Sequence, residues 1–146
     1  MTGYERIHVI GHSLGGLISR YYVQRLGGDS YVQTLVTLAT PHHGTQLARA
    51  ASLLPLVRRL TPGSALMQEL AEPAPSCRTR FIAFHSDIDP LIVPGRNACL
   101  DHPDLNVQNI AVHGVGHLSM PNNGRIAFTI AEALRQLDHD GAAANP

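Results

Sequence analysis

The sequence predicts one α/β domain in which about four parallel strands are flanked by helices. Short apolar runs rich in β-branched residues alternate with segments whose apolar residues recur at helical spacing. A glycine-rich turn joins the first apolar run to the first helical segment. The length of 146 residues fits a single domain, which we place at residues 1–140, with residues 141–146 as a flexible tail.

The first predicted unit is a strand, a sharp turn and a helix. Residues 7–10 form a short apolar run that suits a parallel strand buried on both faces. The helix is predicted over residues 14–26, with an apolar stripe on one side and polar residues such as Arg20 on the other. Two glycines at 27–28 are expected to end it, because glycine is common just after a helix.

The rest of the chain predicts three more strands and a closing helix. A short turn leads from the first helix to the next strand, so the unit is β-α-β and the pairing is parallel. The strands are predicted at residues 31–38, 79–85 and 105–113, and the last helix at residues 125–137.

Residues 46–72 form a segment of a different kind. Their apolar residues have helical spacing, but Pro55 and Pro62 interrupt it. Ser64 is expected to cap a short helix that ends at Ala71. Two interpretations stay open for this segment: ordinary packing helices, or an apolar cap over a substrate pocket.

The composition argues against several classes of protein. A formal net charge of +0 gives no electrostatic reason to expect nucleic acid or an anionic membrane as a partner. No stretch is long enough to span a bilayer, and the first residues lack the apolar core of a signal peptide. Cys77 and Cys99 allow at most one internal disulfide.

The turn after the first strand carries the pattern Gly-x-Ser-x-Gly, formed by Gly11, His12, Ser13, Leu14 and Gly15. A sharp turn between strand and helix exposes the serine Oγ, and a Cβ at either glycine is expected to crowd that turn. The N–H of Leu14, at the helix N-terminus, is placed to donate to a developing oxyanion. The pattern therefore predicts an activated serine nucleophile. The alternative is a glycine-rich turn in which the serine only caps the helix.

An activated serine needs a histidine base and a carboxylate that orients it, both in loops after strand ends. Asp87 and Asp89 follow the third predicted strand, and position alone does not separate them. One of the two, which we take as Asp87, is expected to be a turn aspartate bonded to its own backbone. His117 lies in a glycine-flanked loop after the fourth strand and is the predicted base, whereas His113 is expected to be packed or hydrogen-bonded.

Metal and cofactor sites have weak support. The sequence contains no His-Glu-x-x-His pattern, and its two cysteines are too few for a zinc knuckle. It also lacks a Gly-x-Gly-x-x-Gly fingerprint and has no lysine after the glycines of the turn, which argues against a phosphate cradle. We therefore predict neither a metal nor a cofactor.

Two early motifs resemble those of a known family. Residues 10–16, which contain the serine turn, and residues 37–45, Thr-Leu-Ala-Thr-Pro-His-His-Gly-Thr, together look like α/β-hydrolase lipases and esterases of the bacterial triacylglycerol-lipase type. The second motif favours a lipase over other hydrolases. The resemblance covers about residues 4–137.

Two later motifs agree with the same family, in the same order. Residues 86–94 are similar to its acid loop, in which the catalytic aspartate precedes an apolar pair and a later proline. That arrangement matches Asp89 better than Asp87. Residues 114–118, Gly-Val-Gly-His-Leu, are similar to the family's histidine loop.

The resemblance implies a serine carboxylic-ester hydrolase that acts on an ester or lipid through an acyl-enzyme. The implied triad is Ser13, Asp89 and His117. Two alternatives stay open: an acyltransferase or thioesterase with the same triad, and an incomplete or inactive relative that acts as a binding module.

The chain resembles the C-terminal part of such a domain, because family members place several strands before the nucleophile strand. We therefore expect the nucleophile strand to form an edge of the sheet, through which the chain could self-associate. In the family an earlier loop gives the second oxyanion donor, so only the N–H of Leu14 is assigned here.

Overall fold

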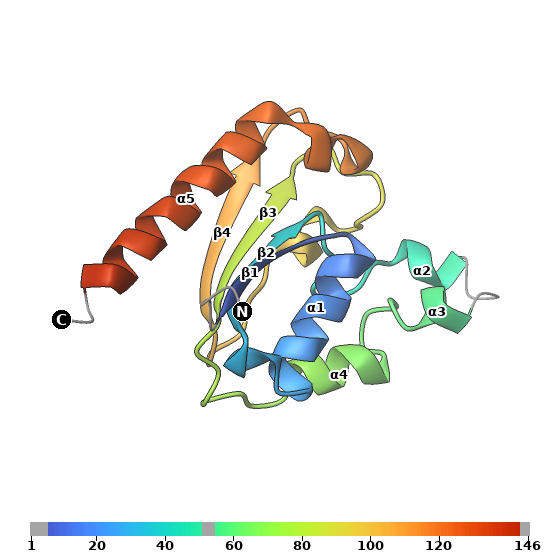
Figure 1. The fold of residues 1–146 in the computed structure, drawn as a ribbon. Coiled ribbons are helices and arrows are strands. Elements are labelled where there is room, and N and C mark those ends of the chain that lie inside the picture. Colours follow the sequence, from blue (N-terminus) through green and yellow to red (C-terminus); the bar gives the residue numbers. More distant parts are fainter. Residues whose placement is uncertain (1–5, 51–54, 144–146) are drawn as a thin grey trace.

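A four-stranded parallel sheet lies at the centre of the structure, a computed structural model that describes residues 6–50 and 55–143 (Figure 1). The strands lie in the order of the sequence, and each pairs in parallel with the next. They are β1 (Ile7–His12), β2 (Val32–Leu38), β3 (Arg80–Ser86) and β4 (Asn106–Val112). This confirms the predicted fold class.

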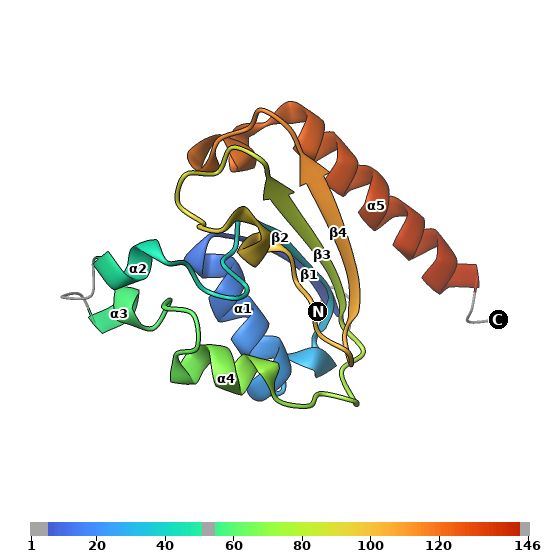
Figure 2. The same ribbon diagram turned by 180° about the vertical axis from the view of Figure 1, so that it is seen from behind.

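Helices cover both faces of this sheet. One face carries α1, with α4 packed on its outer side, and the other carries α5 (Figures 1 and 2). The α-helices are α1 (Leu14–Arg25), α2 (Leu47–Ala50), α3 (Pro55–Arg58), α4 (Ala65–Ala71) and α5 (Gly124–Ala143). Three short 3₁₀ helices are η1 (Gly28–Ser30), η2 (Gly95–Ala98) and η3 (His117–Asn122).

The two central strands, β2 and β3, bury consecutive residues on alternate faces of the sheet. On the face covered by α5, the core contains Val36, Leu38, Ile82, Phe84, Ile126 and Ile130. On the face covered by α1, it contains Val23, Val32, Leu35, Phe81 and Ala83. Burial on both sides explains why these strands are apolar runs rather than alternating sequences.

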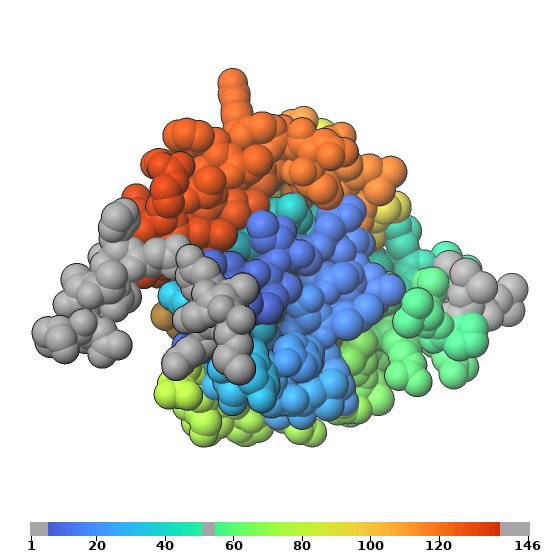
Figure 3. Space-filling view, in the orientation of Figure 1, coloured from blue at the N-terminus to red at the C-terminus, as the bar shows by residue number. Residues whose placement is uncertain are grey.

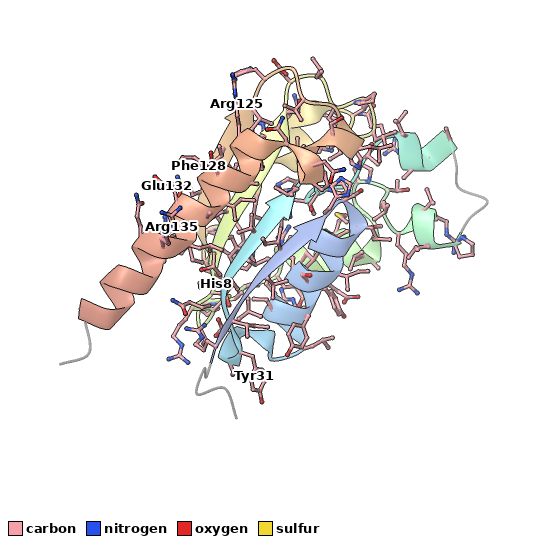
Figure 4. The ribbon with its side chains drawn as sticks, turned by 45° about the horizontal axis from the view of Figure 1, so that its top comes forward. His8, Tyr31, Arg125, Phe128, Glu132 and Arg135 are labelled. Carbon is pink, nitrogen blue, oxygen red and sulfur yellow. The ribbon has the colours of Figure 1, made fainter. Side chains whose placement is uncertain are left out.

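The closing helix α5 is amphipathic. It extends beyond the predicted end to Ala143, and residues 144–146 of the predicted tail lie outside the described residues. Its outer side carries Arg125, Phe128, Glu132 and Arg135 (Figure 4). Within the described residues, no helix is both long enough and apolar enough to cross a membrane.

Helix α1 buries a charged residue that the sequence placed on its polar side. Arg20 is 2% exposed, whereas Ile18 of the predicted apolar stripe is 61% exposed. The guanidinium donates hydrogen bonds to Gln24 Oε1 (2.6 Å), His42 O (3.1 Å) and Leu70 O (2.9 Å). The sequence does not predict the burial of Arg20, which arises because α4 and the loop after β2 cover the side of α1 on which it lies. Burial lowers the pKa of Arg20 to about 10.

Strand β1, which precedes the serine turn, is an edge of the described sheet, as expected. Ile7 and Ile10 of β1 are 56% and 54% exposed, which is unusual for a parallel strand. In the space-filling view, β1 and α1 (blue) lie at the surface between α5 and the helices α2–α4 (Figure 3). Between β1 and α5 lies an apolar hollow of about 440 Å³.

The segment after β2 forms the short helices α2, α3 and α4. The Oγ of Ser64 accepts a hydrogen bond from the N–H of Met67 (3.4 Å), which confirms the predicted cap of α4. Pro55 begins α3 rather than only interrupting a helix, since proline suits a first helical position. Residues 51–54 of the predicted cap segment lie outside the described residues.

Candidate active site

Three side chains predicted to act together meet at the carboxyl ends of the strands. Ser13 follows β1, Asp89 follows β3 and His117 follows β4. The Oγ of Ser13 lies 2.9 Å from His117 Nε2, and His117 Nδ1 lies 2.7 Å from an oxygen of Asp89. With Nδ1–H donating to the carboxylate, Nε2 is left to accept the serine proton.

The backbone of Ser13 is strained in the way that the predicted turn requires. Its φ of 53° and ψ of −124° lie where residues other than glycine are uncommon. Helix α1 begins at the next residue, Leu14. Among residues 6–50 and 55–143, the Leu14 N–H donates no hydrogen bond, so it is free to bind an oxyanion.

The glycines of the turn differ in how much space they have. A Cβ on Gly11 would lie 2.6 Å from the Cα of Gly16, in the backbone of α1. A Cβ on Gly15 would meet nothing within 4 Å, so the prediction that Gly15 avoids a clash was wrong. Gly16 is the second constrained position, because its Cβ would overlap the Oγ1 of Thr40.

The carboxylate of Asp89 is buried, and both of its oxygens accept hydrogen bonds. Its side chain is 2% exposed, and one oxygen accepts from His117 Nδ1–H. The other oxygen accepts from the backbone N–H groups of Leu91 (2.8 Å) and Ile92 (3.3 Å). These bonds compensate the carboxylate for the loss of water and fix its direction.

Asp87 has partners in a distant loop besides the predicted bond to its own backbone. It accepts hydrogen bonds from His113 Nδ1–H (2.9 Å) and the N–H of Gly114 (3.0 Å), in the loop that leads to His117. The bond from His113 and then that from Gly114 lower the pKa of Asp87. Asp87 therefore bonds to the loop after β4 as well as to its own turn. His113 was expected to be either packed or hydrogen-bonded. It is hydrogen-bonded, and its side chain is 80% exposed rather than packed.

His12, the residue before Ser13, contacts the loop of the candidate base. Its Nε2–H donates to the carbonyl oxygen of His117 (2.9 Å), and the two rings lie 5.0 Å apart. The sequence placed His12 in the serine turn but did not reveal this contact, which depends on how the loop after β4 returns to β1.

A buried polar network that the sequence did not predict lies behind the site. His42 is 2% exposed, its Nε2–H donates to Thr37 Oγ1 (2.9 Å), and Arg20 Nη1 donates to its carbonyl oxygen. Burial, followed by the positive charges of Arg20 and His43, holds the pKa of His42 well below 6.5. His42 is therefore neutral, and the network joins β2, the following loop and α1.

The neutral state of His42 predicts how stability depends on pH. Below about pH 6.5 the unfolded chain binds a proton at His42 that the folded chain does not, so acidification favours unfolding. The free energy of unfolding is expected to decrease by up to about 1.4 kcal/mol for each pH unit, with no contribution from His42 above this range. Urea unfolding between pH 7.5 and 5.5 measures this slope. His42→Gln should reduce it, and an equal slope in the variant contradicts the assignment.

The described residues offer no group of three or more His, Cys, Asp or Glu side chains placed to hold a metal ion. Cys77 and Cys99 are unpaired and partly buried. Burial raises the pKa of both thiols, which disfavours the reactive thiolate. Ser13 is therefore the better candidate nucleophile.

Comparison with solved structures places the fold among the α/β-hydrolases. The mature form of the Bacillus licheniformis lipase BlEst2 has a TM-score of 0.68 and 19% identity, covering 89% of this chain and 65% of that one. The α/β hydrolase MGS-MChE2, from a sediment metagenome of the Mar Chica lagoon, has a TM-score of 0.63 and 19% identity, covering 93% and 64%. The Paleococcus ferrophilus monoacylglycerol lipase has a TM-score of 0.58 and 15% identity, covering 91% and 68%. This chain spans less than two thirds of the length of the first two.

The sequence itself matches a protein family. The family model described as palmitoyl protein thioesterase matches residues 2–85, more than half of the chain. The matched part contains β1 with the serine turn, β2 with its Thr-Pro-His-His-Gly loop, and most of β3. By this match and by its α/β-hydrolase fold, the chain belongs to the palmitoyl protein thioesterase family.

Proposed function

We propose that this chain is a serine hydrolase of carboxylic esters in which Ser13, His117 and Asp89 form a catalytic triad. The observation that carries the proposal is the pair of hydrogen bonds from Ser13 Oγ to His117 Nε2 (2.9 Å) and from His117 Nδ1 to Asp89 (2.7 Å). This is the arrangement that activates a serine for acyl transfer.

In the proposed reaction, His117 Nε2 removes the proton from Ser13 Oγ as the oxygen attacks the ester carbonyl carbon. The Leu14 N–H donates to the oxyanion of the tetrahedral intermediate. The intermediate collapses, His117 protonates the departing alcohol, and an acyl-serine remains. Water, deprotonated by His117, then attacks the acyl-serine and releases the acid. Asp89 stabilises the charged imidazolium in both steps.

We propose that the described part of the segment 46–72, residues 46–50 and 55–72, caps the acyl side of this site. A cavity of about 920 Å³ lies between α1 and the helices α3 and α4, and it begins at Leu14, the residue with the oxyanion donor. Its walls are largely apolar and include Leu14, Ile18, Tyr22, Leu56 and Leu66. An apolar cavity beside a nucleophile favours a substrate with a hydrocarbon chain.

A thioester is the second candidate substrate, and the family match favours it. The same triad attacks a thioester carbonyl, but a thiolate is a better leaving group than an alkoxide and needs less help from His117. An acyltransferase would use the same acyl-serine and pass it to an acceptor other than water. The triad itself does not distinguish these outcomes.

The proposal is tested by hydrolysis of p-nitrophenyl butyrate by the purified chain. Ser13→Ala is expected to lower the rate by about 10³-fold or more, because no other group replaces the nucleophile. Retained activity in Ser13→Ala would contradict the proposal. Parallel assays with p-nitrophenyl palmitate and palmitoyl-coenzyme A separate ester from thioester preference, and added ethanol reveals any acyl transfer to an alcohol.

We also propose that two copies of the chain associate through β1. Within the described residues, β1 pairs with β2 on one side only, and it presents two exposed isoleucines beside an apolar hollow. Sedimentation velocity is expected to show a dimer that Ile10→Lys converts to a monomer. Unchanged sedimentation of this variant would contradict the proposal.

A further inference from the structure

We infer that Thr40, at the end of β2, is a positioning residue that orients the oxyanion donor Leu14 N–H through the peptide bond it shares with Ser13. This inference rests on the proposed serine mechanism. It concerns a residue that neither reacts nor touches the substrate.

The end of β2 holds both backbone polar groups of Ser13. The N–H of Ser13 donates to the carbonyl oxygen of Leu38 (2.8 Å). The carbonyl oxygen of Ser13 accepts from the Oγ1–H of Thr40 (3.0 Å). Thr40 thus supplies a bond from outside α1, in addition to the helical bonds that this carbonyl accepts from Gly16 (3.1 Å) and Leu17 (3.4 Å).

A strained residue, Ala39, lies between Leu38 and Thr40, the two residues that bond to the backbone of Ser13. Ala39 has a φ of 47°, and within the described residues only Ser13 shares a positive φ without being glycine. Its N–H donates to Phe84 O on β3 (3.0 Å), and its side chain is fully buried. The left-handed conformation of Ala39 ends β2 and brings the Thr40 hydroxyl to the Ser13 carbonyl. The strain at Ala39 is therefore associated with this contact.

The Thr40 side chain is confined in this position. It is 0% exposed, and its Oγ1 occupies the space that a Cβ on Gly16 would need. Because Gly16 has no side chain, the Thr40 hydroxyl can come close to α1 and reach the carbonyl oxygen of Ser13. The contact of Thr40 with Gly16 and with the Ser13 carbonyl therefore holds the start of α1 against the segment that follows β2.

The planarity of the peptide bond carries this constraint to the oxyanion donor. The Ser13 carbonyl and the Leu14 N–H belong to one planar, trans peptide group, so they point in opposite directions along one plane. A hydrogen bond that fixes the carbonyl at one end fixes the direction of the N–H at the other. It also polarises the group and strengthens the N–H as a donor. The effect appears when the oxyanion forms, and therefore in kcat.

Thr40→Val tests this inference because valine keeps the shape of the side chain and removes the hydroxyl. With p-nitrophenyl butyrate, kcat is expected to decrease by about tenfold, less than the loss of a whole oxyanion donor, while KM changes by less than about twofold. Thr40→Ser keeps the hydroxyl and is expected to retain kcat within about threefold. Thr40→Ala also removes the hydroxyl, and it does not require a methyl group to fit in the place of the hydroxyl. It is expected to lower kcat as Thr40→Val does.

Thr34→Val is the matched control. Thr34 lies on β2 and, like Thr40, is 0% exposed, but its Oγ1 has no hydrogen-bond partner among the described residues. Its replacement is expected to leave kcat and KM unchanged. If Thr40→Val and Thr40→Ala keep the wild-type kcat, or if Thr40→Ser loses as much as they do, the inference is wrong. Retained activity in Ser13→Ala instead overturns the proposed function, so the two failures are distinguishable.

Discussion

Asp89→Asn is expected to lower kcat for ester hydrolysis by about 10⁴-fold while leaving the fold intact. In the wild type, the carboxylate of Asp89 accepts the Nδ1–H of His117 and leaves Nε2 free to take the serine proton. The asparagine amide presents an N–H group in place of one oxygen, which favours the histidine tautomer that cannot act as a base. Because the carboxylate is 2% exposed, water does not replace it. Steady-state kinetics with p-nitrophenyl butyrate and the circular dichroism spectrum measure the two effects.

Asp87→Asn is the matched control, two residues earlier in the same loop. Asp87 contacts His113 and Gly114 at the surface, with its side chain 49% exposed. Exposed pairs of this kind contribute little, so we expect kcat to change by less than about threefold. A larger loss in Asp87→Asn than in Asp89→Asn would reverse the assignment of the catalytic acid.

Gly11→Ala is expected to lower the free energy of unfolding by about 3 kcal/mol. The new Cβ would lie 2.6 Å and 2.7 Å from the Cα and N of Gly16. These are backbone atoms, so the clash is relieved only if β1 and α1 move apart at Ser13. Urea unfolding gives the free energy, and the variant should also lose esterase activity because Ser13 moves with the turn.

Gly15→Ala provides the contrast within the same motif. An added Cβ there meets nothing within 4 Å, and Gly15 lies in helix α1. Alanine is favoured over glycine in a helix by up to about 1 kcal/mol, so this variant should be as stable as the wild type or more stable. Equal destabilisation by the two substitutions would show that the packing around the turn is not as described.

The sequence predicts most of the fold because the signals that determine it are local. Buried strands such as 79–85 are apolar runs, and Ser64 caps α4 through a contact three residues away. The candidate triad is also predictable, because parallel strands bring their carboxyl ends to one edge of the sheet. Ser13, Asp89 and His117 meet there, although 104 residues separate the serine from the histidine.

The features that the sequence does not predict depend on contacts between distant segments. Arg20 is on the polar side of α1, but α4 covers that side, and the guanidinium reaches a carbonyl 50 residues away. The pattern Gly-x-Ser-x-Gly makes Gly11 and Gly15 look equivalent, whereas the close approach of Thr40 makes Gly16, rather than Gly15, the second constrained position after Gly11. The partner of Asp87 is decided by the path of the loop after β4. None of these contacts has a signature in local composition or spacing.

Labelling with a fluorophosphonate, followed by intact and peptide mass spectrometry, tests the proposed triad most directly. The reagent reports an activated serine without requiring knowledge of the natural substrate. The triad predicts one adduct per chain, located on Ser13, absent in Ser13→Ala and formed much more slowly in Asp89→Asn. A folded wild-type chain that forms no adduct, or forms it on another residue, would contradict the assignment of Ser13 as the nucleophile.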